Sequence, residues 1–340
     1  MEPSFPSQRT SLDKEEESSP NGHESRYRDI ISTLPKDDSW KPLGFHYQYQ
    51  GFWYFPATFL EGIMSAQEQF EAQPSDILVS SVPKSGTTWL KALTYAIVTR
   101  ARFDPSTTSP LLTTMPHECI PTVEGDLFHN STNRDPQLPL VATHIPYTSL
   151  PKSIMDSGCK IVYIFRDPKD AFVSLWHFAG RYIAPKDHRE EYCPLEEAFK
   201  LFCKGMSFYG PYWDHVIGYW KASLEWPGRV LILKYEDVMR DTEFHVKRLA
   251  EFMGYGFSLE EEKEGMVQKI INLCSFENLS NLSVNKTGMH RLRSSSLLEI
   301  EKSSFFRKGK VGDWKNHLSA EMAEEMDRIT DHKFGSVGLR

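Results

Sequence analysis

Four short apolar runs, separated by segments with helical periodicity, limit the folds open to this chain more than any other feature of its sequence. The runs are DILVSSV (76–82), LVATH (140–144), KIVYIF (160–165) and RVLILKY (229–235). None of them alternates polar and apolar residues, which is typical of parallel strands buried on both faces. Helical spacing between the runs, as in Leu90, Leu93 and Ile97, predicts an α/β fold: a single domain with a central parallel sheet flanked by helices.

Charge and cysteine content argue against several classes of protein. The chain has 39 Lys and Arg against 46 Asp and Glu, a net charge of -7, which argues against an extended nucleic-acid surface. Its five cysteines are odd in number and lack CxxC spacing, which argues against a disulfide framework and a zinc site and favours a reducing compartment. No signal-peptide core and no long apolar run is found. We therefore expect a cytoplasmic protein that binds neither nucleic acid nor membranes.

Two segments do not fit the alternation of strands and helices. Residues 1–25 are rich in Ser, Pro and Glu and poor in aromatic residues, so we expect a disordered tail before a domain that spans residues 26–340. Residues 286–304, KTGMHRLRSSSLLEIEKSS, match neither pattern, and their length is typical of a lid or a mobile loop.

The first candidate site follows the first predicted strand, in SVPKSGTTWLKAL (81–93). Gly86 allows a close turn, and Thr87 and Thr88 begin a helix. Free amides at the helix start, the two hydroxyls and the Lys84 ammonium predict a phosphate site. Lys84 precedes the glycine, whereas the lysine of a Walker A loop follows it. The alternative is a plain strand-turn-helix corner with a solvated lysine.

A second candidate anion site follows the third predicted strand, in RDPKDAFVSLWHF (166–178). Asp167 can cap the next helix, and Ser174 lies about two helical turns after Arg166. A guanidinium and a hydroxyl in this relation can bind a second phosphate. The alternative is an arginine that only pairs with Asp167 or Asp170. A third basic cluster, FFRKGKVGDWK (305–315), taken alone would be a solvated surface loop.

Three stretches, PKSGTTW, RDPKDAFVS and RKGKVGDW, in this order and separation, resemble the cytosolic sulfotransferases. These enzymes transfer a sulfuryl group from 3′-phosphoadenosine 5′-phosphosulfate (PAPS). The resemblance covers roughly residues 30–338, and LCSFENLSNLSVNK (273–286) is most similar to plant members that act on flavonols, hydroxyjasmonate, brassinosteroids and desulfoglucosinolates. It implies a single α/β domain related to P-loop nucleotide kinases, a small hydroxylated plant acceptor, a flavonol first, and no required metal.

The resemblance also implies a role for each matching residue of the donor site. Lys84 would act on the bridging oxygen, where negative charge builds up as the S–O bond breaks, and PAPS has no γ-phosphate that would require a Walker A loop. Trp89 and Phe276 would stack on adenine, Tyr235 would meet its amino edge, and Cys274 stands where many members have threonine. The residues implied in donor binding are Lys84, Ser85, Gly86, Thr87, Thr88 and Trp89 at the 5′ end, Arg166, Ser174, Arg307, Lys308 and Gly309 at the 3′-phosphate, and Tyr235, Cys274 and Phe276.

His144, in VATHIP at the end of the second predicted strand, is the candidate general base. A histidine is more often structural, and the chain has 12 of them, but this one ends a strand beside the donor site and matches the catalytic histidine of the family. It would take the acceptor's hydroxyl proton as the oxygen attacks sulfur. Many animal members carry lysine just before the Thr-His pair; here Ala142 leaves one positive charge missing near the sulfate. His117 and His177 are alternative bases.

Acceptor and assembly are less sharply defined. Five aromatic candidates for the acceptor pocket suggest a flat or apolar acceptor: Phe52, Trp53, Tyr54, Phe178 and Tyr209. The dimer signature KxxxTVxxxE of many relatives is degraded to KNHLSAEMAE (315–324), which leaves a monomer or a weak homodimer. Two other functions stay open. A P-loop kinase would need a GxxxxGK[ST] loop, and none is found; a catalytically inactive nucleotide-binding scaffold would have lost the base, which His144 argues against.

Overall fold

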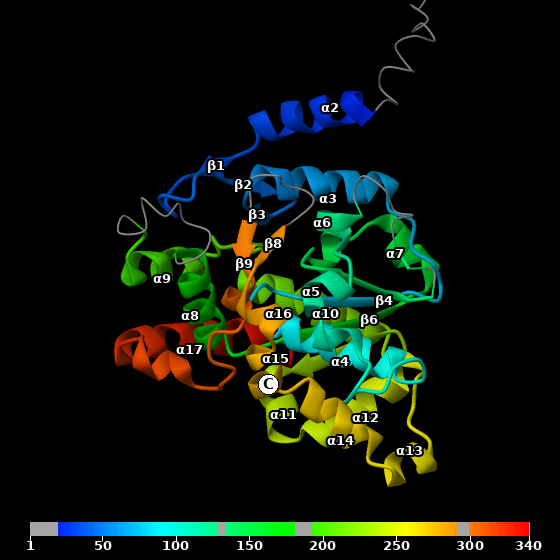
Figure 1. Cartoon of the computed structure of the whole chain (residues 1–340). Helices are drawn as coiled ribbons and strands as arrows, with labels where there is room; N and C mark the ends of the chain where they lie inside the picture. The colour runs from blue at the N-terminus through cyan, green and yellow to red at the C-terminus, as the bar shows by residue number, and fades with distance from the viewer. Residues whose placement is uncertain (1–19, 128–133, 136, 181–191, 292–298, 340) are drawn as a thin grey trace, which may run out of the picture.

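Four parallel strands form the centre of the computed structural model, which describes residues 20–127, 134–135, 137–180, 192–291 and 299–339 (Figure 1). They are β4 (Ile77–Ser81), β5 (Leu140–Thr143), β6 (Lys160–Phe165) and β7 (Val230–Lys234), in the order β5-β4-β6-β7. Each strand lies inside one of the four apolar runs, so the prediction of a central parallel sheet is confirmed.

Helices bury both faces of this sheet, which explains why its strands show no polar alternation. Leu78 and Ile161 face a core built with α3 (Ala57–Gln69), α8 (Pro168–Phe178), α10 (Tyr212–Glu225) and α17 (Ala320–Gly335). Val79 and Val162 face the opposite core, built with α4 (Thr87–Thr99), α12 (Thr242–Met253) and α14 (Met266–Leu273). Register pairs Ser80 with Thr143, so the residues after them, at the carboxyl ends of β4 and β5, become neighbours.

Smaller elements surround the sheet and its helices. An antiparallel sheet of β1 (Lys36–Asp37), β2 (His46–Tyr49) and β3 (Phe52–Tyr54) lies near α2 (Pro20–Thr33) and α3, at the top of Figure 1. Further helices in the described residues are α5 (Pro116–Cys119), α6 (Val123–Asp126), α7 (Lys152–Ser157), α9 (Leu195–Cys203), α11 (Tyr235–Arg240), α13 (Leu259–Lys263), α15 (Phe276–Asn281) and α16 (Ser283–Lys286), with 3-10 turns η1 (Pro110–Leu112), η2 (Tyr147–Ser149), η5 (Lys302–Phe305) and η6 (Asp313–Asn316).

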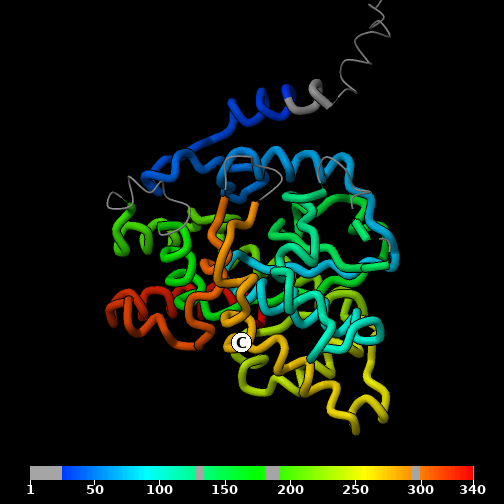
Figure 2. Tube along the Cα trace, viewed as in Figure 1, coloured from blue at the N-terminus to red at the C-terminus, as the bar shows by residue number. Residues whose placement is uncertain are grey.

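Both segments that did not fit the sequence pattern contain some regular structure. Helix α2 begins at Pro20, so the last six residues of the predicted tail are helical, and residues 1–19 lie outside the described part of the chain. In the predicted loop 286–304, β8 (Met289–Arg291) pairs antiparallel with β9 (Glu299–Glu301), and residues 292–298 are not among those described. The pair runs from α16 toward β2 and β3 (Figure 2). Strands of three residues are too short to produce a periodic signal.

Candidate active site

The loop after β4 forms a tight corner at the start of α4. Lys84 (φ 68°) and Gly86 (φ 112°) both lie in the left-handed region, which is strained for a lysine. A Cβ on Gly86 would stand 2.8 Å from Cδ2 of Tyr235, so only glycine fits there. Helix α4 begins at Thr87, as predicted, and Thr88 Oγ1 shares a 2.9 Å hydrogen bond with Nε2 of His117.

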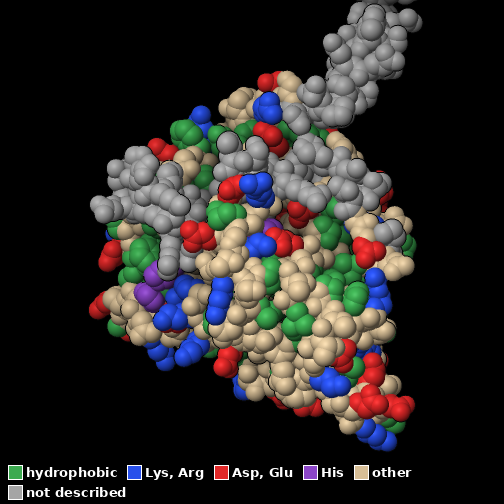
Figure 3. Space-filling model, in the orientation of Figure 1, with side chains coloured by type: hydrophobic (Ala, Val, Ile, Leu, Met, Phe, Trp, Pro, Cys, Tyr) green, Lys and Arg blue, Asp and Glu red, His purple; other side chains and the backbone are tan. Residues whose placement is uncertain are grey.

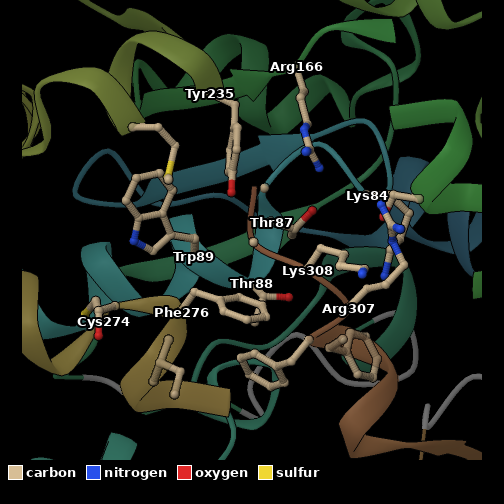
Figure 4. A pocket seen from close by; sticks show the side chains of 18 of the residues that line it. Lys84, Thr87, Thr88, Trp89, Arg166, Tyr235, Cys274, Phe276, Arg307 and Lys308 are labelled. Carbon is tan, nitrogen blue, oxygen red and sulfur yellow. The ribbon is translucent and has the colours of Figure 1, made fainter. Parts of the chain in front are cut away.

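A cavity of about 310 Å³ opens at this corner, outside the carboxyl ends of the strands (Figure 4). Four cationic side chains line it: Lys84, Arg166, Arg307 and Lys308. No carboxylate belongs to the described residues of its wall. The Nε atoms of Arg166 and Arg307 are buried without a hydrogen-bond partner. Cations with unsatisfied donors in a wall without a carboxylate indicate a site for an anion.

The ammonium of Lys84 lies among these charges and against two aromatic rings. Its Nζ stands 4.0 Å from the ring centroid of Phe178 and 5.7 Å from that of Phe305. Burial, reinforced by the charges of Arg307 and Arg166, lowers the pKa of Lys84 to about 7. An anion in the cavity would therefore raise the pKa of this lysine back toward its ordinary value.

Arg166 forms an ion pair, as one of the two alternatives expected, and is also part of the cavity wall. It follows β6 directly, pairs with Asp170 at 3.2 Å and donates through Nη2 to the carbonyl of Lys310 at 2.5 Å, yet it also lines the cavity. Asp170, buried in the first turn of α8, further accepts from the amides of Gly312 (2.7 Å) and Trp314 (3.1 Å). This carboxylate thus holds the third basic cluster, residues 305–315, against Arg166 and the start of α8. Sequence analysis did not assign this role to it.

The turn that contains Arg307, Lys308 and Gly309 closes the cavity instead of standing free in solvent. Gly309 has φ 60°, and a Cβ there would be 2.3 Å from Cγ of Phe276, so the two residues touch. Arg307 pairs with Asp313 at 2.5 Å. Beyond the cavity, Lys, Arg and His side chains gather on the surface around α17 (Figure 3).

Aromatic rings line the side of the cavity away from Lys84 and Arg307 (Figure 4). Trp89 and Tyr235 meet edge to face with their centroids 5.5 Å apart, and Phe276 is 37% exposed, which leaves a ring face open. Ser174 and the buried Cys274 also belong to the wall. Of the residues predicted for the donor site, all except Ser85 line this one cavity; Ser85 is buried in the corner itself.

His144 is held on three sides at the end of β5. Its Nδ1 lies 2.7 Å from the carbonyl of Ser81, and because a carbonyl can only accept, Nδ1 carries the proton. The lone pair therefore resides on Nε2, which has no hydrogen-bond partner among the described residues. Burial lowers the pKa of His144 to about 4, and the charges of Lys91 and Lys84 contribute. The imidazole is neutral at pH 7, as a general base must be.

Two buried residues position His144, and no sequence motif marked either of them. Glu124 (in α6) accepts from the backbone amide of His144 at 2.7 Å and from the hydroxyl of Thr143 at 2.8 Å. His215 (in α10) donates through Nε2 to the carbonyl of His144 at 2.9 Å and accepts from the hydroxyl of Tyr163 at 2.9 Å. Both ends of the His144 backbone are thereby fixed to other elements.

A second, smaller cavity of about 110 Å³ shares His144 with the first. Of the five aromatic acceptor candidates, Phe178 and Tyr209 line it, whereas the three from β3 do not, because Phe52 and Tyr54 pack into the core. Sequence analysis missed other apolar wall residues, among them Phe55, Phe59, Phe208, Ile300 and Phe305. They come from segments far apart in the chain and carry no common signal.

The two alternative bases are placed less favourably than His144. His117 lines both cavities, but its Nε2 is occupied by Thr88, and burial puts its pKa well below the ordinary range. His177 lies against His317 with ring centroids 4.7 Å apart and borders neither cavity. Of the three, His144 is the one that borders both cavities with its Nδ1 fixed by a backbone carbonyl and its Nε2 without a hydrogen-bond partner among the described residues.

The cation-lined cavity adjoins a mostly apolar one, and both lie at the carboxyl ends of parallel strands. This arrangement suits an enzyme that transfers a group from an anionic donor to an apolar acceptor. Residues 74–338 match the sulfotransferase domain family, and the chain belongs to this family. It is thus an enzyme that transfers a sulfuryl group to a small metabolite.

Relatives and solved structures agree with this assignment. The chain is 49% identical to cytosolic sulfotransferase 16 of Arabidopsis thaliana, over 93% of this chain and 92% of the relative. It is 53% identical to flavonol 4′-sulfotransferase of Flaveria chlorifolia, over 86% and 89%. A solved Arabidopsis thaliana sulphotransferase is 37% identical with TM-score 0.71, covering 99% of each chain. Mouse sulfotransferase SULT7A1 complexed with PAP is 25% identical with TM-score 0.64, covering 85% and 94%. In the described part of this chain no helix is long and apolar enough to cross a membrane.

Proposed function

We propose that this enzyme transfers the sulfuryl group of PAPS to a hydroxyl group of a small plant metabolite, with a flavonol as the first candidate and His144 as the general base. Flavonol sulfotransferases of Flaveria species, 53% and 51% identical to this chain, support the choice of acceptor. The complex of mouse sulfotransferase SULT7A1 with PAP supports the choice of donor. We further propose action in the cytoplasm, as a monomer or weak homodimer, without a metal, by a domain that spans residues 26–340.

The observation that carries this proposal is the pair of buried, unpartnered Nε atoms on Arg166 and Arg307. PAPS has two separate anionic ends, and the cavity offers four cations to bind them. Lys84, with Thr87 and Thr88 at the start of α4, fits the 5′-phosphosulfate. Arg166, Arg307 and Lys308 fit the 3′-phosphate, together with Ser174 and Gly309. On the side of the cavity away from Lys84 and Arg307, Trp89, Tyr235, Cys274 and Phe276 fit the adenine.

In the reaction, each residue performs one task. His144 takes the acceptor's proton on Nε2 as the acceptor oxygen forms its bond to sulfur. The electron pair of the breaking S–O bond remains on the phosphate, and Lys84 neutralises the charge that develops there. Phe178 and Phe305, which contact Lys84 and line both cavities, exclude water from the junction.

A donor comparison tests this function. The purified protein is incubated with PAPS, adenosine 5′-phosphosulfate or ATP, with and without EDTA, and with flavonols, hydroxyjasmonate, brassinosteroids and desulfoglucosinolates. We expect sulfated product from PAPS, unaffected by EDTA, and a flavonol among the best acceptors. A phosphorylated product from ATP would support a kinase instead. Failure to form product with any of the three donors would support an inactive scaffold.

Replacement of Arg166 by alanine should reduce the preference for the 3′-phosphorylated donor. Loss of one partner of a largely desolvated charge pair should weaken PAPS binding by roughly 2 to 4 kcal/mol. Adenosine 5′-phosphosulfate lacks the 3′-phosphate, so its affinity should barely change. Calorimetry with both donors on wild type and variant gives the ratio of the two donor affinities. A general loss of affinity from the broken contacts to Asp170 and Lys310 cancels in this ratio.

Arg100→Ala is the matched control, because Arg100 also pairs with a carboxylate, Glu261 at 2.7 Å, and donates to backbone carbonyls, but does not line the cavity. It should leave the ratio of the two affinities unchanged. Equal losses for both donors in Arg166→Ala would mean that Arg166 serves the fold or the 5′ end of the donor.

A further inference from the structure

Lys91, in the first half of α4, is a buried charge that the proposed reaction does not yet use. Its side chain is only 2% exposed. The ammonium donates to the carbonyl of Ile120 at 3.1 Å and, more weakly, to the hydroxyl of Thr122 at 3.4 Å. Among the described residues, no carboxylate lies within 4.0 Å of it. A buried ammonium without an ion pair is costly to the fold, so its presence calls for a compensating interaction.

The surroundings of Lys91 place this charge in the smaller cavity, beside the candidate base. Lys91 and Thr122 both line that cavity, together with His144. Thr122 forms a bridge to Ala142, directly before the Thr143-His144 pair. The ammonium has three N–H donors, and the two acceptors named above leave one of them free for a ligand. The charge of Lys91 also contributes to the lowered pKa values of His144, His117 and His290, after the larger effect of burial.

We propose that Lys91 is a catalytic residue of the smaller cavity that donates a hydrogen bond to the acceptor oxygen as that oxygen attacks sulfur. The proposal rests on the function proposed above. The acceptor's proton passes to Nε2 of His144, the oxygen's electron pair forms the new bond to sulfur, and the S–O bond to the 5′-phosphate breaks with its electron pair. Lys91 keeps its own proton throughout and stabilises the negative charge on the oxygen before the new bond is complete.

This assignment also accounts for the positive charge that the sequence lacks directly before the Thr-His pair. Ala142 and Lys91 line the same cavity, and Lys91 is the residue that supplies it with an ammonium. A purely structural role is the competing explanation: Lys91 would only tie α4 to residues 120–122, with Glu124 and Asp126 compensating its charge from a distance. That role would affect stability but not the ionisation of a bound phenol.

The test measures the pKa of a bound chromophoric phenol and does not need turnover. 4-Nitrophenol is titrated spectroscopically on the wild type, with and without adenosine 3′,5′-bisphosphate, and its phenolate absorbance is followed against pH. We expect its pKa to be lower when bound than when free. In Lys91→Met the bound pKa should rise by about 1 to 3 units, the shift expected when an opposite charge within a few ångströms is removed. Lys91→Arg should restore most of the effect.

Lys160→Met is the matched control, since Lys160 also donates to a backbone carbonyl, that of Phe252 at 2.7 Å, but lies at the opposite end of its strand from the site. It should leave the bound pKa unchanged. If Lys91→Met does not fold, Lys91→Gln keeps a donor toward Ile120 without the charge and gives the same measurement.

The outcomes separate this inference from the proposed function. A bound pKa that is the same in wild type and Lys91→Met overturns the inference even if PAPS is turned over, and so does a wild type that does not bind the phenol. A Lys91-dependent shift without sulfation by any donor supports the contact to the acceptor oxygen and overturns the proposed reaction instead.

Discussion

Replacement of His144 by alanine should reduce kcat by about 10²- to 10⁴-fold, because that is the typical contribution of a positioned general base. Donor affinity should stay within a few-fold of the wild type, since the cations of the larger cavity are untouched. Single-turnover measurements of sulfate transfer, combined with calorimetry of donor binding, separate the two quantities. Near-normal turnover in the variant would show that another group accepts the proton.

His177→Ala is the control for this experiment. His177 borders neither cavity, so we expect wild-type kinetics within about two-fold, an effect of less than about 0.5 kcal/mol. A loss of activity in His177→Ala together with an active His144→Ala would reverse the assignment of the base.

The pH profile of the wild type gives a second test of the same residue. Burial lowers the pKa of His144 to about 4, so the imidazole of the free enzyme stays unprotonated down to that range. As pH falls through about 4, protonation removes the base, and kcat/KM should then decline. An acidic limb centred near the ordinary histidine value of about 6.5 would mean that the base is more solvated than in this structure.

Replacement of Lys84 by methionine should lower kcat by about 10²- to 10³-fold while raising the donor KM much less, because a charge directed at the breaking bond acts chiefly in the transition state. Methionine keeps an apolar stem against Phe178 and Phe305 and removes only the charge. Steady-state kinetics at varied donor concentration supply both constants. An effect confined to KM would reduce Lys84 to a binding residue.

Lys308→Ala is the matched comparison for Lys84, because it removes a cation from the same cavity at the proposed 3′-phosphate end. Its effect should fall mainly on KM. The opposite distribution, with kcat lost in Lys308→Ala and KM raised in Lys84→Met, would mean that the two ends of the donor lie the other way round.

Calorimetry can detect the unusual ionisation of Lys84 without any turnover. In the free enzyme its pKa is about 7, so a large part of the population has a neutral amine at pH 8. Binding of an anion raises this pKa, and donor binding should therefore take up a fraction of a proton, visible as a dependence of the binding heat on the buffer's ionisation enthalpy. Lys84→Met should lose this uptake, and a wild type without it would contradict the depressed pKa.

Sequence alone was sufficient wherever the signal is local. Each strand of the central sheet is a continuous apolar run, because burial on both faces leaves no polar positions within it. Helix α4 begins at Thr87 and α8 is capped by Asp167, as their first residues predicted. Lys84, Arg166 and His144 stood out because each lies at or just after the end of a predicted strand, whereas the roles of Cys274, Phe276 and residues 307–309 were predicted only from the family resemblance.

Residues whose roles depend on contacts between distant segments were not found in this way. Asp170 acts on amides more than 140 positions away, at Gly312 and Trp314, and Glu124 and His215 hold the backbone of His144 from two different helices. The smaller cavity likewise combines rings from separate segments, and the rings of β3, which are neighbours of Phe55 in sequence, do not line it.

Lys91 shows most clearly the difference between what the sequence determines and what the tertiary structure determines. In the sequence it is one more lysine in a helix, seven residues after Lys84, and its type favours a solvated position. Only the packing of α4 against residues 120–122 buries its ammonium and brings it into the same cavity as Ala142. Local propensity and strand-end position, which depend on neighbouring residues, were thus determined by the sequence by itself. Tertiary structure alone decided that the buried charge of Lys91 faces the smaller cavity. Burial and the local electric field depend on atoms that only the folded chain brings together.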